Sequence, residues 1–193
     1  MSKTLCYSFF ETAIGACAIA WGARGITAVS LPEAHVKALR SRFTQRFPEA
    51  REDTPSADIG EAIARIQALL TGKADDLSDI PLDDTDVPLF NKRVYEVARR
   101  IPPGSTRTYG EIAKELCDPL LAQSVGQALG RNPFPIIVPC HRVLAANGKT
   151  GGFSATGGIE TKFRMLAIER AKTDNAPSLF DELPLAAPPR RPH

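Results

Sequence analysis

A cysteine and a histidine stand side by side in the block Pro139-Cys140-His141-Arg142-Val143. A thiol acts as a nucleophile in its thiolate form, and a neighbouring imidazole or guanidinium lowers the pKa of the thiol. The apolar run Phe134 to Val138 directly before the block predicts a short buried strand that leads into the cysteine. The block therefore predicts a cysteine nucleophile with a base beside it, and the elements around it must indicate the electrophile.

Two short helices are expected just before this block. The segment Glu111 to Cys117 is predicted to be helical, Asp118-Pro119 ends it, and another helix is expected from Leu121 to about Arg131. Two short helices joined by a tight turn are typical of a helix-turn-helix, which places its second helix on DNA. The sequence thus favours thiol chemistry on DNA.

The segments after the helix pair are expected to complete the same unit. Residues 136–153 are predicted to form a strand, a turn at Asn147-Gly148 and a glycine-rich return. A final helix is expected from Ile159 to about Arg170, and its inward side chains are Ile159, Phe163 and Leu166.

The first half of the chain has a different pattern. Apolar or β-branched segments separated by turn residues predict three strands, at Leu5 to Phe10, Ala16 to Trp21 and Gly25 to Val29. Three helices with one buried face are also expected, and the residues of these faces are Val36, Leu39 and Phe43; Ile59, Ile63, Ile66 and Leu70; and Phe90, Val94, Val97 and Ile101. Residues 73–88 connect the last two, with one strand predicted around Ile80 to Leu82.

Composition bounds the class of protein. The 193 residues are 43% hydrophobic and 24% charged, which is ordinary for a globular chain of one large or two small domains. Residues 87–193 hold 15 Lys/Arg and 9 Asp/Glu, about +6, whereas residues 1–86 hold 9 and 13, about −4. A basic half suits a polyanionic partner. No apolar run approaches the roughly 18 residues of a membrane helix, and no signal peptide is expected, so the predicted location is the cytoplasm.

Several blocks of the second half occur in the order found in one family. The blocks are Ile101-Pro102-Pro103-Gly104, Thr108-Tyr109-Gly110-Glu111-Ile112-Ala113, Val125-Gly126-Gln127-Ala128, Asn132-Pro133, Pro139-Cys140-His141-Arg142-Val143 and Lys162 to Glu169. In these blocks the chain resembles the O6-alkylguanine-DNA alkyltransferases, also called methylated-DNA–protein-cysteine methyltransferases. The resemblance is strong over residues 86–170 and weaker over residues 1–85.

The resemblance implies a fold and an activity. The expected fold is an α/β N-terminal RNase H-like domain (1–85) plus a C-terminal winged helix-turn-helix domain (86–171), followed by a disordered tail (172–193). The expected activity is DNA repair by stoichiometric, single-turnover transfer of an alkyl group from a flipped O6-alkylguanine to the protein. Double-stranded DNA containing O6-alkylguanine is the implied partner, the chain is expected to be a monomer, and no cofactor, metal or membrane is implied.

The resemblance also assigns catalytic roles. Cys140 is expected to accept the alkyl group, His141 to take the thiol proton through a water, and Glu169 to orient His141. Asn132 is expected to stabilise the turn that holds the cysteine, and Tyr109 to donate to the guanine as it leaves. Arg142 and Lys162 are expected to be structural or to face phosphates.

Further positions are implied for substrate and DNA. The predicted pocket and DNA contacts comprise Tyr109, Gln123, Ser124, Arg131, Pro135, Val143, Phe153 and Ser154. Gln123 departs from the family, which normally has an arginine there that fills the gap left by the flipped base. Glutamine can hydrogen-bond the orphaned cytosine but brings no charge. The loop 154–158 is a residue or two longer than usual.

Two other functions fit the same residues. The chain can be a sensor that binds alkyl lesions without repairing them, although relatives of that kind replace the cysteine with tryptophan. It can also be a DNA-binding regulator whose Cys140 responds to alkylating agents. A Cys-His hydrolase fits least, because no substrate-binding features accompany the pair.

Overall fold

The computed structural model describes residues 4–146 and 158–171. The predicted turn at Asn147-Gly148, the predicted site residues Phe153 and Ser154, and the tail 172–193 lie outside these ranges.

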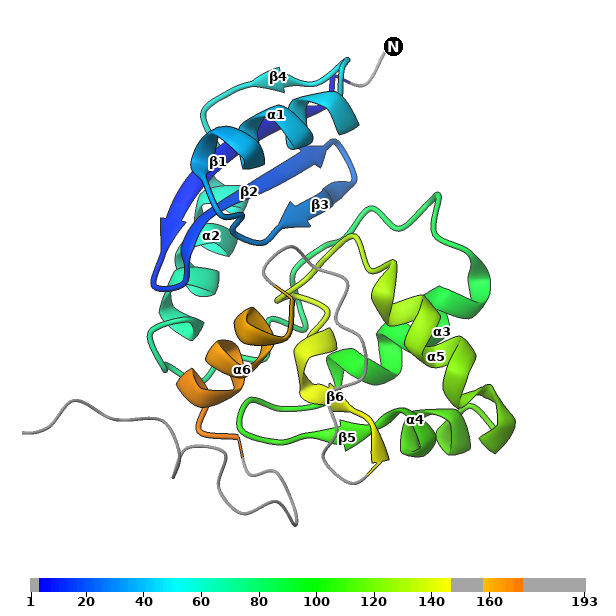
Figure 1. Ribbon diagram of the computed structural model, residues 1–193. Helices are drawn as coiled ribbons and strands as arrows, with labels where there is room; N and C mark the ends of the chain where they lie inside the picture. The colour runs from blue at the N-terminus through cyan, green and yellow to red at the C-terminus, as the bar shows by residue number, and fades with distance from the viewer. Residues whose placement is uncertain (1–3, 147–157, 172–193) are drawn as a thin grey trace, which may run out of the picture.

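The N-terminal part is a four-stranded sheet with a helix on each face (Figure 1). Its elements are β1 (Cys6–Thr12), β2 (Gly15–Gly22), β3 (Gly25–Ser30), α1 (Val36–Arg46), β4 (Arg51–Glu52) and α2 (Ala57–Leu69). The strand order is β3-β2-β1-β4; β1, β2 and β3 pair antiparallel, and β4 pairs parallel to β1. The three predicted strands are confirmed.

The central strand β2 is buried on both faces, and its alternation decides which helix each face takes. Side chains two residues apart share a face of a strand. One face carries small residues, Ala16, Ala18 and Ala20, which pack in a cluster with Phe43 of α1. The opposite face carries Cys17, Ile19 and Trp21, which pack in the main core together with α2.

One predicted core residue of α1 is on the surface. Val36 is 48% exposed, whereas Leu39 and Phe43 are buried. The helix begins at Val36 itself, with His35 as its N-cap. Val36 therefore lies at the helix end, outside the aromatic cluster that covers the next turn.

The C-terminal part contains the two short helices expected from the sequence. Its elements are α3 (Leu89–Arg99), β5 (Arg107–Thr108), α4 (Tyr109–Glu115), the 3-10 turn η1 (Pro119–Leu121), α5 (Ala122–Gly130), the 3-10 turn η2 (Cys140–Arg142), β6 (Val143–Leu144) and α6 (Gly158–Ile168). A capping box fixes the start of α4, because the Thr108 hydroxyl accepts from the Glu111 N–H while the Glu111 carboxylate accepts from the Thr108 N–H.

Three details of the second half differ from expectation. The strand predicted to start at Ile136 does not form there, and the next strand along the chain is β6. The segment that leads into η2 is a compact loop. Ile159 is 46% exposed, because α6 begins at Gly158 and its buried face starts with Lys162. The strand predicted around Ile80 is reduced to a single bridge, between Leu82 and Ile26.

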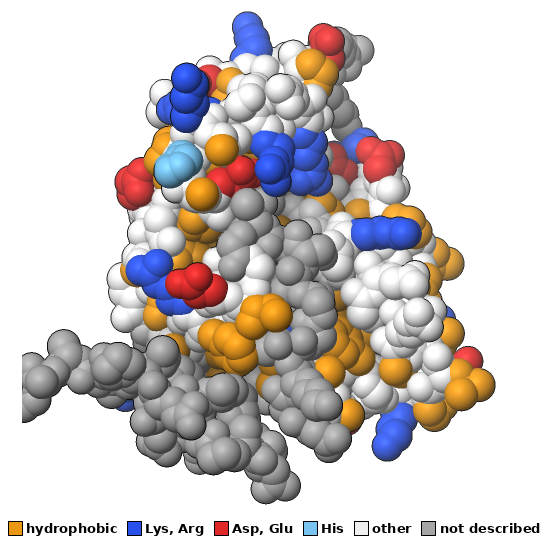
Figure 2. Space-filling model, viewed as in Figure 1, with side chains coloured by type: hydrophobic (Ala, Val, Ile, Leu, Met, Phe, Trp, Pro, Cys, Tyr) orange, Lys and Arg blue, Asp and Glu red, His pale blue; other side chains and the backbone are white. Residues whose placement is uncertain are grey.

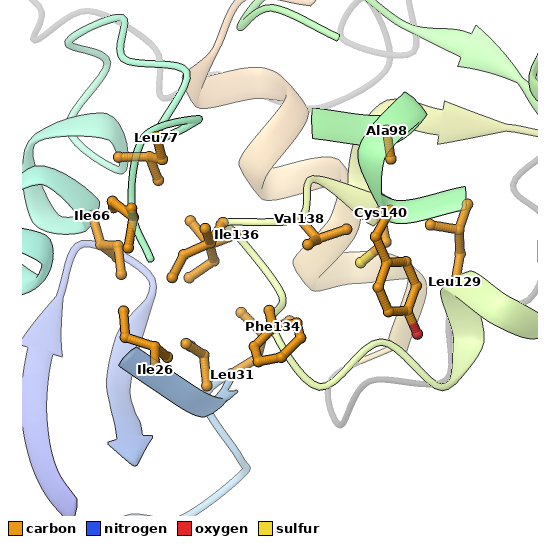
Figure 3. Packing of buried hydrophobic residues seen from close by; sticks show 14 of the residues in the cluster. Ile26, Leu31, Ile66, Leu77, Ala98, Leu129, Phe134, Ile136, Val138 and Cys140 are labelled. Carbon is orange, nitrogen blue, oxygen red and sulfur yellow. The ribbon is translucent and has the colours of Figure 1, made fainter. Parts of the chain in front are cut away.

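The two parts share one core. The Val29 N–H donates to the Pro133 carbonyl at 2.8 Å, which ties β3 to the loop before η2. Figure 3 shows the packing that follows: side chains of the sheet region lie at one end of the cluster, Phe134, Ile136 and Val138 bridge it, and Cys140 lies at the other end. The N-terminal sheet therefore supports the segment that carries the cysteine.

No helix in residues 4–146 and 158–171 is both long enough and apolar enough to span a lipid bilayer.

A close backbone contact predicts that stability is sensitive to substitution of Gly25. Gly25 has φ +125°, and a Cβ there would lie 2.6 Å from the carbonyl oxygen of Pro81. We expect Gly25→Ala to lower the free energy of unfolding by about 1–3 kcal/mol, through backbone strain and displacement of the Pro81 carbonyl. Urea unfolding followed by the fluorescence of the single tryptophan, Trp21, measures this loss.

Gly60→Ala is the matched control. Gly60 lies inside α2 with open space around it, so alanine should raise stability by about 0.5–1 kcal/mol. A Gly25→Ala protein whose free energy of unfolding equals that of the parent contradicts the prediction.

Candidate active site

Asn132 organises the loop that leads to the cysteine. Its side-chain oxygen accepts from the Phe134 N–H at 2.9 Å, and its amide nitrogen donates to the Val138 carbonyl at 2.9 Å. The Val138 N–H in turn donates to the Phe134 carbonyl at 2.8 Å. Ile136 adopts φ +77°, an uncommon conformation for a β-branched residue. One amide side chain thus closes a compact loop and explains why this apolar run is not a strand.

The cysteine, histidine and arginine form the buried turn η2. Cys140 is 7% exposed, and His141 and Arg142 are each 1% exposed. The Arg142 N–H donates to the Pro139 carbonyl at 2.9 Å, which closes the 3-10 turn. Three consecutive polar side chains are therefore removed from water, and burial of this kind requires a partner for each charge.

Glu169 is the hydrogen-bond partner of two of these side chains, His141 and Arg142. Its side chain is 3% exposed and lies just beyond the end of α6. One carboxylate oxygen is 3.0 Å from His141 Nε2 and accepts from Arg142 Nη2 at 2.7 Å; the other accepts from Arg142 Nε at 2.9 Å. Burial alone raises the pKa of Glu169, but the bonds from His141 and Arg142 outweigh it and lower the pKa to about 2.

The Glu169 contact fixes the tautomer of His141. Burial lowers the pKa of His141, so the imidazole is neutral near pH 7. Nε2 must then carry the hydrogen that points at the carboxylate, and Nδ1 keeps its lone pair. Nδ1 is buried and has no hydrogen-bond partner among the described residues. His141 therefore holds a basic nitrogen ready for a proton.

Arg142 is sequestered from solvent. Besides its two bonds to Glu169, it donates to the Ile101 carbonyl at 2.7 Å. It thus joins the turn η2, the end of α6 and the segment after α3. The expected structural role fits this position, whereas a contact with phosphate does not, because the guanidinium is buried.

Cys140 is a thiol at rest. Burial raises its pKa, while a hydrogen bond with Asn132 and the nearby charge of Lys162 act in the opposite direction. The sequence predicted a thiol whose pKa is lowered by its neighbours in the chain. In the resting site the pKa is raised instead, because burial outweighs the neighbouring groups, and the guanidinium of Arg142 is paired with Glu169.

Lys162 bonds to the residue that ends this turn, and its amine lies near the ring of Tyr109. Lys162 is fully buried, donates to the Val143 carbonyl at 2.7 Å, and lies 6.0 Å from the centre of the Tyr109 ring. Its burial excludes a phosphate contact and lowers its pKa to about 8. Burial also raises the pKa of Tyr109, so the phenol keeps its proton and can donate it.

Tyr95 is a neighbour of the cysteine that the sequence did not indicate. It is buried in α3, its hydroxyl donates to the Ala128 carbonyl at 2.9 Å, and its pKa is raised to about 12, chiefly by burial. Tyr95 and Cys140 belong to the same buried cluster, and the negative charge of an ionised Cys140 would raise the pKa of Tyr95 further. An aromatic residue beside an apolar helix face carries no sequence signal of such a position.

The predicted DNA-binding residues fall into two groups. Gln123 and Arg131 are exposed at opposite ends of α5, and Ser124 is half-buried beside the first. Pro135 and Val143 are buried near the cysteine. Since Phe153 and Ser154 lie outside the described residues, the pocket they were expected to complete stays a prediction.

Within the described parts of the chain, no group of three or more His, Cys, Asp or Glu side chains is arranged to hold a metal ion.

Known proteins are similar to this chain over most of its length. A family model described as "6-O-methylguanine DNA methyltransferase, DNA binding domain" matches residues 89–171. The methylated-DNA–protein-cysteine methyltransferase of Mycolicibacterium paratuberculosis is 40% identical over 129 residues, which cover 67% of this chain and 75% of the relative. The protein of the same name from Methanosarcina acetivorans is 34% identical over 163 residues, which cover 84% and 97%.

Solved structures are similar over comparable lengths. The O6-methylguanine methyltransferase of Mycobacterium tuberculosis superimposes with a TM-score of 0.70 at 31% identity, covering 92% of this chain and all of that one. A structure described as Mycobacterium tuberculosis OGT in complex with DNA gives a TM-score of 0.69 at 31% identity, with coverage of 86% and 92%.

The shared carboxylate predicts a pH-dependent contribution to stability. Because the folded pKa of Glu169 is about 2, below its ordinary 4.5, its ionised form stabilises the fold above pH 4.5, and this contribution is lost as pH falls towards 2. We expect Glu169→Gln to lower the free energy of unfolding at pH 7 by about 3 kcal/mol. In urea titrations the gap between parent and variant should narrow as the pH falls from 4.5.

Glu160→Gln provides the control, because Glu160 is an exposed carboxylate in the first turn of the same helix. It should leave the unfolding midpoint almost unchanged. A gap between the Glu169→Gln protein and the parent that stays constant from pH 7 to pH 3 contradicts the prediction.

Proposed function

Because this chain belongs to the methylated-DNA–protein-cysteine methyltransferases, which repair DNA by direct alkyl transfer, we propose that Cys140 accepts the alkyl group of O6-alkylguanine. The observation that carries the proposal is the buried turn in which the thiol of Cys140 adjoins a neutral His141 whose Nε2 faces Glu169. A nucleophile, a base and a group that orients the base are the parts that such a transfer needs.

We assign the two parts of the fold to an RNase H-like domain at residues 1–85 and a winged helix-turn-helix domain at residues 86–171. The helix pair α4 and α5 and the matched range 89–171 support the second assignment. The four-stranded sheet with helices on both faces supports the first. We further propose that the protein acts as a monomer in the cytoplasm.

The proposed reaction begins with removal of the thiol proton. His141 Nδ1 takes the proton from Cys140 through a bridging water, because this nitrogen holds the free lone pair. Glu169 stabilises the imidazolium that forms, and Arg142 holds the carboxylate in place. The raised pKa of Cys140 means that the base must act, since a thiolate does not persist in the resting site.

The transfer itself exchanges one bond for another. The Cys140 sulfur forms a bond to the alkyl carbon as the bond from that carbon to guanine O6 breaks, and the electron pair leaves with the base. Tyr109 donates its phenolic hydrogen to the guanine as negative charge develops, and the raised pKa of the phenol keeps that hydrogen available. The thioether is stable, so each molecule reacts once. The target must be flipped out of the duplex to meet a buried thiol.

We predict a covalent product on one cysteine. Incubation with duplex DNA containing O6-methylguanine should add the mass of one methylene to the protein, and peptide mapping should place it on Cys140. The Cys140→Ser protein should show no added mass under the same conditions. The other three cysteines remain in that variant, so it controls for nonspecific alkylation.

The opposite result selects a different function. Lesion-dependent DNA binding by folded protein, with no adduct in the presence of excess lesion DNA, would falsify the transfer proposal and support a lesion sensor.

We also propose that Gln123 occupies the space left by the flipped base. It is exposed at the start of α5, three residues before Gly126, whose Cβ position lies 3.8 Å from the Tyr109 ring. Residues three apart share a helix face, so Gln123 lies on the side of α5 that meets the site. Arg131, exposed just after the same helix, supplies a phosphate contact.

Replacing Gln123 tests this role. Gln123→Arg should tighten binding to lesion-containing duplex by about 1–3 kcal/mol, because a guanidinium adds charge and donors opposite the orphaned cytosine. The rate of methyl transfer from a single-stranded oligonucleotide should stay unchanged, since no base pair is opened there. Equal duplex affinities for parent and variant would mean that Gln123 does not face the gap.

A further inference from the structure

Leu120 is the most exposed of the large hydrophobic residues in the described chain. It is 90% exposed, whereas the next, Leu89 at the start of α3, is 76% exposed. A single exposed leucine is unremarkable in most settings. Leu120 differs in its position, because it lies in the turn of the helix pair within the range matched by the DNA-binding domain.

The backbone that presents Leu120 is held firmly. The Asp118 side chain accepts from the Leu120 N–H at 2.9 Å, and the Asp118 carbonyl accepts from the Leu121 N–H at 3.1 Å. Pro119 fixes one backbone dihedral between them, and Cys117 enters the turn with φ +70°. An ordered backbone loses little entropy when its side chain enters a contact.

Leu120 leads an exposed row along α5. The row continues at Gln123 and Gln127, three and seven residues further on, and both are exposed. Gln123 lies on the face of α5 that meets Tyr109, as described above. Leu120 therefore projects next to the residue proposed to face the orphaned base, at the leading end of the helix.

The segment that runs from the end of α4 through α5 has no basic side chain of its own. No lysine or arginine occurs from residue 115 to residue 130, and Lys114 and Arg131 flank the segment. In Figure 2 the surface over α5 is largely white, with hydrophobic side chains at the lower right over the turn between α4 and α5. Side chains of this segment therefore cannot neutralise phosphates, and Leu120 and Gln123 offer an apolar and an amide contact for bases and sugars.

We propose that Leu120 is an apolar wedge that inserts into the base stack beside the extruded nucleotide. The inference rests on the proposed function, and it assigns the opening of the stack to Leu120 and the orphaned base to Gln123. Apolar wedges, leucine among them, unstack base steps in other DNA-binding proteins and stabilise the distorted duplex. The wedge supplies in this chain part of the stabilisation that a charged side chain at position 123 would give.

Two readouts separate the wedge from the chemistry. The first is the fluorescence of 2-aminopurine placed next to O6-methylguanine in a duplex, which rises when the neighbouring bases unstack. The second is the rate of methyl transfer from the same lesion in duplex and in single-stranded DNA. The proteins compared are the parent, Leu120→Ala, Leu120→Met and Leu120→Asn, with Leu89→Ala as the matched loss of an exposed leucine elsewhere.

The wedge predicts a pattern across these proteins. Leu120→Ala and Leu120→Asn should lose most of the fluorescence rise and transfer from duplex about tenfold more slowly, a factor equivalent to about 1.4 kcal/mol. Their transfer from single-stranded DNA should match the parent. Leu120→Met, which keeps an apolar side chain of similar length, and Leu89→Ala should behave like the parent with both substrates.

Other outcomes overturn the inference. Duplex unstacking and transfer that are unaffected by Leu120→Ala show that this residue contacts something other than the base stack. Equal losses in duplex and single-stranded DNA show a general defect in the site. If the parent unstacks the duplex and the Leu120→Ala protein does not, yet no protein transfers a methyl group, the wedge stands and the proposed alkyl transfer fails.

Discussion

The carboxylate of Glu169 joins the end of α6 to the turn η2 through hydrogen bonds from one histidine and one arginine, all out of contact with water. A buried carboxylate needs such partners, and the buried guanidinium of Arg142 needs it equally. Burial leaves His141 uncharged, and its contact with Glu169 leaves the basic lone pair on the nitrogen turned away from the carboxylate. The same contact therefore secures the fold and sets the protonation of the site. Arg142 extends it to the Ile101 carbonyl, so three segments far apart in the sequence meet at one group.

The features that the sequence predicts are those with a local cause. Strand β2 alternates between its two faces, and the helix pair follows from Asp118-Pro119, so both were accessible from the pattern of residues. The burial of Arg142 and Lys162 was not accessible in this way. Their partners are a carboxylate 27 residues away and a carbonyl 19 residues away, and neither lies in the same element. The raised pKa of Cys140 was not accessible either, because its largest cause is burial by segments far away in the sequence.

Local patterns also failed at the ends of elements. Val36 and Ile159 share the spacing of buried positions, yet each lies in the first turn of its helix and is exposed. The apolar run after Phe134 has the composition of a strand, but the side chain of Asn132 bonds to both ends of the run and closes it into a loop. Side-chain hydrogen bonds to the backbone compete with pairing between strands, and here they prevail. That loop is tied to the sheet by the hydrogen bond from the Val29 N–H to the Pro133 carbonyl, and it positions the turn η2.

The four free thiols of this chain are buried to different extents, and that difference makes them graded labels for opening of the molecule. Cys117 is at the surface, Cys140 is buried in a turn, and Cys17 is fully buried in the central strand of the sheet. A thiol reagent reaches the buried Cys140 and Cys17 only when the structure around each of them opens. The difference between the modification rates of Cys140 and Cys17 therefore measures how much more readily the turn η2 opens than the sheet unfolds. Because a nucleotide must reach the buried sulfur of Cys140, the same measurement reports the opening that the proposed reaction requires.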